Sequence, residues 1–284
     1  MKFATFLHQI AGPDLARVAR RAEELGFESL WIPEHILLPV EYRSRYPYAA
    51  TGRMPMPPDA PLHDPFLALA YAAAVTNRIR LATGVFVVPL RNAFATAKAV
   101  ASLDVLSGGR FIFGVGIGWL EEEFGAVGMS FANRARRTRE YLALMDQLWT
   151  RKDPAFEGRT VRVAGVRFMP KPIQQPRPPI VLAGHTEPSL RRAAQLADGW
   201  YGIVDNLHDA RDLIARLRGH ERAQNRATPL EITLSPRMDR PLSVELVNAF
   251  AQAGVSRLII PSARDAERAI TAMEQFHDNV MARR

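Results

Sequence analysis

The stretch IRLATGVFVVPLRNAFATAKAVASLDVLSGGRFIFGVG, residues 79–116, holds a strand, a helix and a second strand in that order. Apolar and β-branched residues fill 79–85 and 110–116, and a longer run typical of a helix, 93–106, lies between them. Apolar strands on either side of such a helix are typical of parallel β-α-β units, in which the helix crosses one face of the sheet. This stretch therefore predicts an α/β fold.

The same alternation continues through the rest of the chain. Further strands are predicted at 2–7, 28–33, 180–183, 199–204, 230–235 and 256–260. Further helices are predicted at 13–25, 64–76, 133–150, 186–197, 207–222, 243–252 and 264–277. Eight strand-then-helix units in 284 residues predict one (β/α)8 TIM barrel domain over residues 1–284 rather than a two-domain doubly wound sheet.

Two segments are longer than a minimal barrel needs. The first, about residues 36–63, is rich in proline, contains Tyr42, Tyr46 and Tyr48, and follows a strand at its carboxyl end. The second, about residues 153–179, begins with a predicted hairpin and precedes the strand at 180–183, so its position is less diagnostic. Long ordered loops are usually functional, and TIM barrels place their active sites at the carboxyl ends of the strands. We therefore expect insertions at the C-terminal mouth.

Composition excludes several classes of function. The chain has no cysteine, which removes disulfides, thiolate metal sites and cysteine nucleophiles. The seven histidines show no H-E-x-x-H spacing and the serines no G-x-S-x-G elbow, so we expect neither a metal site nor a serine triad. No apolar run approaches the roughly 18 to 20 residues that cross a bilayer, and the N-terminus does not resemble a signal peptide. We expect a cytoplasmic protein without a membrane partner.

The net charge of +8 comes from 37 basic and 29 acidic residues. The basic residues are scattered over helical stretches, without the basic tail or long basic run of a nucleic-acid-binding arm. We expect no nucleic-acid partner, and the charge favours a small molecule that carries phosphate.

Several predicted strands end in residues that can carry chemistry. Glu34 and His35 follow the strand at 28–33, where an imidazole can hydrogen-bond to, or exchange a proton with, a bound ring or substrate. The alternative is a loop histidine bonded to backbone. Gly84 follows Thr83 and permits unusual backbone geometry or the close approach of a flat ligand, although a β-bulge would also explain it.

The strand at 110–116 ends in Gly114, Gly116 and Gly118, which remove alternate side chains and are expected to open space for a ligand. Their spacing lacks the G-x-G-x-x-G register of a dinucleotide site. The acidic run 121–123 that follows is either an acid/base or metal cluster, or a solvated first helical turn.

A third candidate is the sequence Gly184, His185, Thr186 after the strand at 180–183. A glycine leads here into a helix start, so backbone N–H groups, the Thr186 hydroxyl and the helix dipole can converge on an anion. An ordinary N-cap would explain the same residues.

Seven motifs together resemble the bacterial luciferase-like family, and within it the coenzyme F420-dependent oxidoreductases. They are ESLWIPEH (28–35), DPF (64–66), RLATGV (80–85), LDVLSGGR (103–110), GVGIGW (114–119), EEF (122–124) and ADGW (197–200). The resemblance runs from about residue 1 to 205 and weakens beyond it.

The resemblance implies a flavin or deazaflavin at the C-terminal mouth, and an oxidoreductase that moves hydride between coenzyme F420 and a small organic substrate. The alternatives are a two-component monooxygenase that uses reduced FMN and dioxygen, and a non-catalytic flavin-binding barrel. A homodimer is expected, and a separate flavin or F420 reductase is a candidate partner.

The resemblance also implies roles for individual residues. It places His35, Glu34 and Glu122 as catalytic candidates near the reactive ring, and Thr83, Gly84, Val85, Gly116, Gly184, His185 and Thr186 as cofactor-binding residues. Gly84–Val85 is expected to be a non-prolyl cis peptide, and residues 184–186 a phosphate cradle. The sequence departs from the family in one respect. The sugar-phosphate dehydrogenase branch has a glutamate as proton donor where this chain has Trp119, which argues against that activity and leaves Glu122 as a weaker acid candidate.

Overall fold

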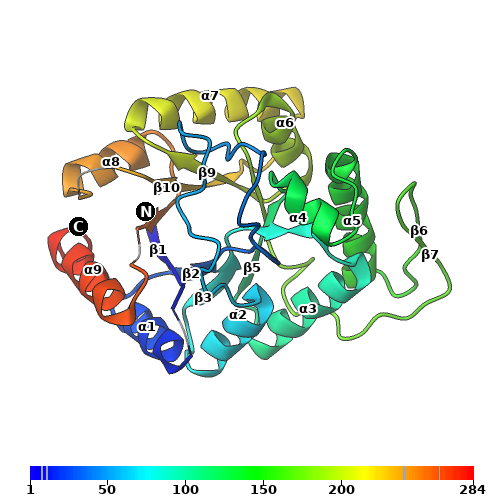
Figure 1. Ribbon diagram of the computed structural model, residues 1–284, viewed down its shortest axis with the longest axis horizontal. Coiled ribbons are helices and arrows are strands. Elements are labelled where there is room, and N and C mark those ends of the chain that lie inside the picture. Colours follow the sequence, from blue (N-terminus) through cyan, green and yellow to red (C-terminus); the bar gives the residue numbers. More distant parts are fainter. Residues whose placement is uncertain (8, 11, 239–240, 262) are drawn as a thin grey trace.

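The computed structural model describes residues 1–7, 9–10, 12–238, 241–261 and 263–284. Its parallel strands form a closed barrel inside a ring of helices (Figure 1). The barrel strands, in chain order, are β1 (Lys2–Phe6), β2 (Ser29–Ile32), β3 (Arg80–Thr83), β5 (Phe111–Gly116), β8 (Ile180–Ala183), β9 (Gly199–Val204), β10 (Glu231–Pro236) and β11 (Arg257–Ile260). The spatial order is β3-β2-β1-β11-β10-β9-β8-β5, and a β3–β5 pairing closes the ring. The (β/α)8 prediction is confirmed.

The outer helices lie close to their predicted bounds. They are α1 (Pro13–Glu24), α2 (Pro65–Ala74), α3 (Ala93–Leu106), α5 (Arg134–Thr150), α6 (Glu187–Leu196), α7 (Leu207–Ala223), α8 (Val244–Gln252) and α9 (Ala266–Asn279). Local side chains explain where several of them begin. Asp64 accepts a hydrogen bond from the backbone N–H of Phe66 at 3.0 Å, and Asn92 does the same for Phe94. Such N-caps satisfy N–H groups that have no partner within the helix.

Two hydrophobic layers hold the barrel together. The larger fills the space between strands and helices, and the smaller lies inside the barrel, where it includes Trp31, Ile112 and Tyr201. Partly buried apolar residues lie against the inner layer at or just beyond the carboxyl ends of four strands: Phe6, Val85, Ala183 and Ile203. The mouth of the barrel therefore has an apolar floor.

The first insertion covers this mouth. In Figure 1 it is the blue trace without helices or strands that runs across the middle of the ring, between β2 and α2. Tyr46 packs edge-on to Trp119 with ring centroids 5.2 Å apart, and Tyr48 packs edge-on to His185 at 4.9 Å. These contacts join the insertion to segments that follow β5 and β8.

The second insertion lies elsewhere. Its predicted hairpin is present as β6 (Phe156–Glu157) and β7 (Arg162–Val163) and projects away from the ring in Figure 1. The remainder reaches the amino end of β5, where the Gln174 side chain donates to the carbonyl of Phe111 at 2.7 Å. Only the first insertion therefore lies at the mouth, because residues just before β8 belong to the opposite end of the barrel.

Four short elements among the described residues were not predicted. They are β4 (Phe86–Val87), two 3-10 turns, η1 (Val88–Leu90) and η2 (Met281–Arg283), and α4 (Glu121–Ala126). The acidic run at 121–123 forms the first turn of α4. It therefore has the position of a helical turn, but Glu123 is buried rather than solvated.

Candidate active site

His35 and Glu123 form a pair at the mouth. Nδ1 of His35 lies 2.9 Å from Oε2 of Glu123, and the exposed fractions of the two side chains are 10% and 2%. The other carboxylate oxygen, Oε1, accepts the backbone N–H of Ile36 at 2.6 Å. Trp119 packs edge-on against the imidazole, with ring centroids 6.1 Å apart. Sequence reasoning selected Glu122 and missed Glu123, although the apolar Phe124 beside it was a sign that this side of the turn faces inward.

Glu122 does not join that pair. Its Oε1 accepts the backbone N–H groups of Arg43 and Ser44, at 2.6 and 3.1 Å. Burial alone would raise the pKa of Glu122, but hydrogen bonds from Ser44 and Arg43 outweigh it and lower the pKa to about 2. The carboxylate is therefore an anchor for the first insertion.

Glu34 points into the protein. Its side chain has no exposed surface, pairs through Oε1 with Arg91 at 2.6 Å, and accepts the Val87 N–H through Oε2 at 2.6 Å. Arg91 also pairs with Asp64 at 2.8 Å. Burial raises the pKa of Glu34 to about 7, against the opposing effects of Arg91 and the Val87 N–H. These bonds fasten the segment after β3 to the end of β2.

The peptide bond between Gly84 and Val85 is cis, as predicted. Thr83 is fully buried, and its hydroxyl donates to the carbonyl of Gly114 at 2.7 Å. A Cβ on Gly114 would lie 1.8 Å from the carbonyl oxygen of Thr83, and one on Gly116 would lie 2.7 Å from the Val85 side chain. The expectation that these glycines open space for a ligand is therefore wrong, because the segment after β3 occupies that space.

Residues 184–186 form the turn between β8 and α6. Gly184 has a φ of +128°, and a Cβ there would lie 2.7 Å from Cβ of Ser189. The exposed Thr186 is the N-cap residue, but its hydroxyl bonds to Ser189 rather than to a backbone N–H of the helix. His185 points across the turn, and its Nε2 accepts the Ile203 N–H at 3.1 Å.

A cavity of about 510 Å³ opens beside this turn. Its lining includes Tyr48 and Ala49 from the insertion, His185, and two arginines, Arg216 and Arg237. Burial, with the two arginines, lowers the pKa of His185 to about 4, so the imidazole is neutral near pH 7.

Arg237 lines this cavity and also carries a buried donor without a partner among the described residues. Its Nη2 pairs with Asp205 at 2.9 Å, whereas its buried Nε has no hydrogen-bond partner within the described ranges. Buried N–H groups normally find acceptors, so this donor suits an anionic ligand. Sequence reasoning missed Arg237, which lies beyond residue 205 where the family resemblance weakens.

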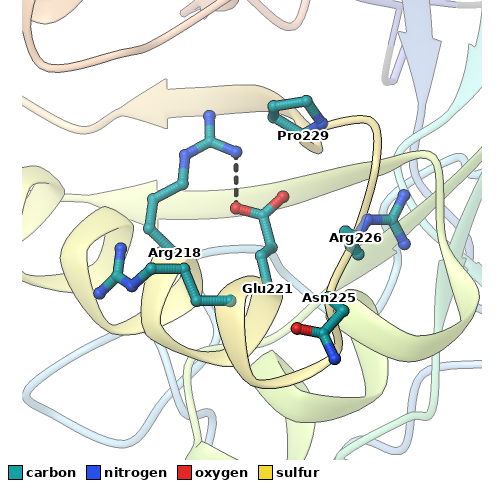
Figure 2. A pocket seen from close by; sticks show the side chains of 6 residues that line it. Arg218, Glu221, Asn225, Arg226 and Pro229 are labelled. Carbon is teal, nitrogen blue, oxygen red and sulfur yellow. Dashed lines mark hydrogen bonds and ion pairs between the residues drawn. The ribbon is translucent and has the colours of Figure 1, made fainter.

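A second cavity, of about 640 Å³, lies at the other end of the barrel (Figure 2). Arg218 pairs there with Glu221 at 2.6 Å, and Glu221 accepts the backbone N–H of Leu230 at 2.5 Å, just before β10 begins. Arg226 donates to the carbonyl of Ala194. These contacts tie the end of α7 to its neighbours and bring together none of the candidate catalytic groups.

Among the residues that the structure describes, no group of three or more histidine, aspartate and glutamate side chains is arranged to hold a metal ion. Within the same ranges, no helix combines the length and the apolar character needed to span a bilayer.

Comparison with curated proteins gives two informative relatives. An uncharacterized protein of Mycobacterium tuberculosis is 38% identical over 187 residues, which are 65% of this chain and 66% of that protein. An F420-dependent glucose-6-phosphate dehydrogenase of Amycolatopsis mediterranei is 30% identical over 275 residues, which are 90% of this chain and 76% of that enzyme.

Solved structures share the fold at low sequence identity. A monooxygenase of Streptomyces bottropensis superposes with a TM-score of 0.77 and 22% identity, and covers 100% of this chain and 99% of its own. A coenzyme F420-dependent tetrahydromethanopterin reductase of Methanopyrus kandleri superposes with a TM-score of 0.78 and 17% identity, and the match covers 99% of both chains. The family model for luciferase-like monooxygenases matches residues 3–278. By fold and by sequence, the chain belongs to the luciferase-like monooxygenase family.

Proposed function

We propose that the protein is an oxidoreductase that binds coenzyme F420 at the C-terminal mouth and moves hydride between it and a small organic molecule. The observation that carries this proposal is the position of His35 just after β2, where Glu123 holds Nδ1 and, among the described residues, no hydrogen bond engages Nε2. The relative that is named an F420-dependent enzyme supports the choice of cofactor.

The residues at the mouth fit such a cofactor. A flat ring needs apolar surface, which Phe6, Val85, Ala183 and Ile203 provide. A phosphate needs N–H donors, which the turn at 184–186 and the guanidinium of Arg237 can supply, since His185 and Arg237 line the same cavity. The apolar floor and the donors therefore fit the chemistry of a phosphate-bearing flavin or deazaflavin.

Each residue then has a defined task. A bound deazaflavin supplies the centre that gives or takes hydride. His35 would hydrogen-bond to the substrate or exchange a proton with it through Nε2. Glu34 would keep the segment with the cis peptide in place through its ion pair with Arg91. Glu122 would hold the first insertion over the mouth, and the insertion would exclude water from the bound molecules.

Trp119 narrows the range of substrates. It lies beside His35 and between the tyrosines of the insertion, with Tyr42 5.6 Å from it. The sugar-phosphate dehydrogenase branch is expected to have a proton-donating glutamate at this position, and this chain has Trp119 instead. We therefore do not propose sugar-phosphate oxidation. Aromatic walls instead suit an apolar or aromatic substrate.

A second candidate is a two-component monooxygenase that uses reduced FMN, dioxygen and a separate reductase. The description of the matching family as luciferase-like monooxygenases favours it, and the same floor and donors would serve FMN.

The proposal includes one cytoplasmic domain that acts as a homodimer. Exposed apolar side chains on α2 and α3 could be covered by a second copy of the chain, since Leu67 and Leu106 are 73% and 74% exposed.

A binding titration of the purified protein against F420, FMN and FAD tests the choice of cofactor. We expect F420 to bind at least about tenfold more tightly than FMN, a difference of about 1.4 kcal/mol. Tighter binding of FMN, with oxygen consumption when reduced FMN is supplied, would favour the second candidate. Binding without turnover against a broad substrate panel would indicate a non-catalytic barrel.

A further inference from the structure

The carboxylate of Glu123 is held from two sides at the start of the first insertion. Oε1 accepts the Ile36 N–H at 2.6 Å, with the Leu37 N–H at 3.4 Å, and Oε2 lies 2.9 Å from Nδ1 of His35. With 2% of its side chain exposed, water competes little for either oxygen. The group therefore has a fixed orientation relative to the imidazole.

This contact determines which ring nitrogen of His35 carries the proton. Oε1 of Glu123 already accepts backbone N–H groups, as a carboxylate does, and a carboxylate only accepts hydrogen bonds, so with Glu123 in this form the 2.9 Å contact places the proton on Nδ1. In the neutral ring, Nε2 is then an acceptor with a free lone pair. Within the described part of the chain, the contact with Glu123 is the only hydrogen bond of the His35 ring, and it leaves Nε2 to a ligand.

We infer that Glu123 is a positioning residue that keeps neutral His35 in the Nδ1–H tautomer, so that Nε2 meets the substrate as a hydrogen-bond and proton acceptor. This inference rests on the proposed function for its catalytic consequence, but the tautomer is a property of the protein alone. The substrate class follows from it. The molecule at the mouth should present an O–H or N–H donor to Nε2, as an alcohol or an amine does.

Glu123→Gln tests the inference because the two side chains have nearly the same shape. The amide oxygen can still accept the Ile36 N–H, which keeps the insertion anchored. The amide NH₂ would then face Nδ1 of His35 as a donor, and this favours the opposite tautomer with the proton on Nε2. Glu121→Gln is the matched control, since it removes the same charge from an exposed residue of the same turn.

The primary measurement is the ¹⁵N spectrum of histidine-labelled protein without cofactor at about pH 9, where free imidazole is neutral. His35→Gln assigns the signal. We expect Nδ1–H in the parent protein and in Glu121→Gln, and Nε2–H in Glu123→Gln. A parent protein with the proton on Nε2, or a Glu123→Gln spectrum identical to the parent, would overturn the inference.

Turnover gives the second measurement. Glu123→Gln should lower kcat by at least about tenfold with little change in cofactor affinity, and adding it to His35→Ala should cause no further loss. Additive losses would show that Glu123 acts independently of His35 and would overturn the inference. If F420 supports no turnover in any variant, the proposed function fails while the spectra still answer the question about Glu123.

Discussion

Acidification is expected to destabilise the protein through His185. Its Nε2 accepts the backbone N–H of Ile203, so protonation of Nε2 would break that bond and set two donors against each other. Burial, together with Arg237 and Arg216, lowers the pKa of His185 from 6.5 to about 4. The unfolded chain therefore takes up this proton at a higher pH than the folded chain. The stability contributed by neutral His185 is present above pH 6.5 and is lost as the pH falls toward 4.

The size of the effect follows from the shift in pKa. One pKa unit corresponds to about 1.4 kcal/mol, so this residue alone should remove about 2.5 kcal/mol between pH 8 and pH 4.5. His185→Gln is the comparison, because its side-chain oxygen can reach the Ile203 N–H but does not titrate. Urea unfolding of both proteins across this range gives the free energy of unfolding at each pH. The difference between them should change by about 2.5 kcal/mol, and curves that stay parallel would refute the reasoning.

Three further predictions concern the mouth and the barrel wall. Gly114→Ala should lower the free energy of unfolding, measured by denaturation, by at least about 3 kcal/mol, because its Cβ would lie 1.8 Å from the Thr83 carbonyl oxygen. Gly125→Ala, with open space around it, should raise the free energy of unfolding by about 0.5–1 kcal/mol. Equal effects of the two substitutions would contradict the packing argument. Glu122→Ala should speed proteolysis within residues 36–63 several-fold while lowering the global free energy of unfolding by no more than about 1 kcal/mol, and an unchanged cleavage rate would remove its role as an anchor. His35→Ala should keep the fold, bind F420 within about tenfold of the parent, and lose at least about a hundredfold in turnover; full activity would return His35 to an ordinary loop histidine.

The barrel could be predicted because its signals are local. Strand and helix periods, and caps such as Asp64 and Asn92, depend on a few neighbouring residues. The glycines of β5 show what local signals cannot predict. Gly114 does mark a close approach of another group, but the sequence does not tell whether that group is a ligand or the chain itself. Here it is the carbonyl of Thr83, which is 31 residues away.

The sequence offered only one sign to separate Glu122 from Glu123, the apolar Phe124, and it did not show what either carboxylate binds, for a similar reason. Both residues lie in the first turn of α4, and their roles depend on the path of an insertion that begins more than 80 residues earlier. Arg237 is a further case. Its significance depends on the cavity that it shares with His185 and Tyr48, which lie on two other segments of the chain.

The two adjacent glutamates of α4 also limit how this protein can be engineered. Glu122 accepts the backbone N–H groups of Arg43 and Ser44. Glu123 binds the His35 imidazole and the Ile36 N–H. A loop from another member of the family, grafted in place of residues 36–63 to change the substrate range, would therefore also alter the support of His35. Such a chimera should transplant α4 together with the loop as one cassette, because a loop moved alone would arrive without the carboxylates that shape it.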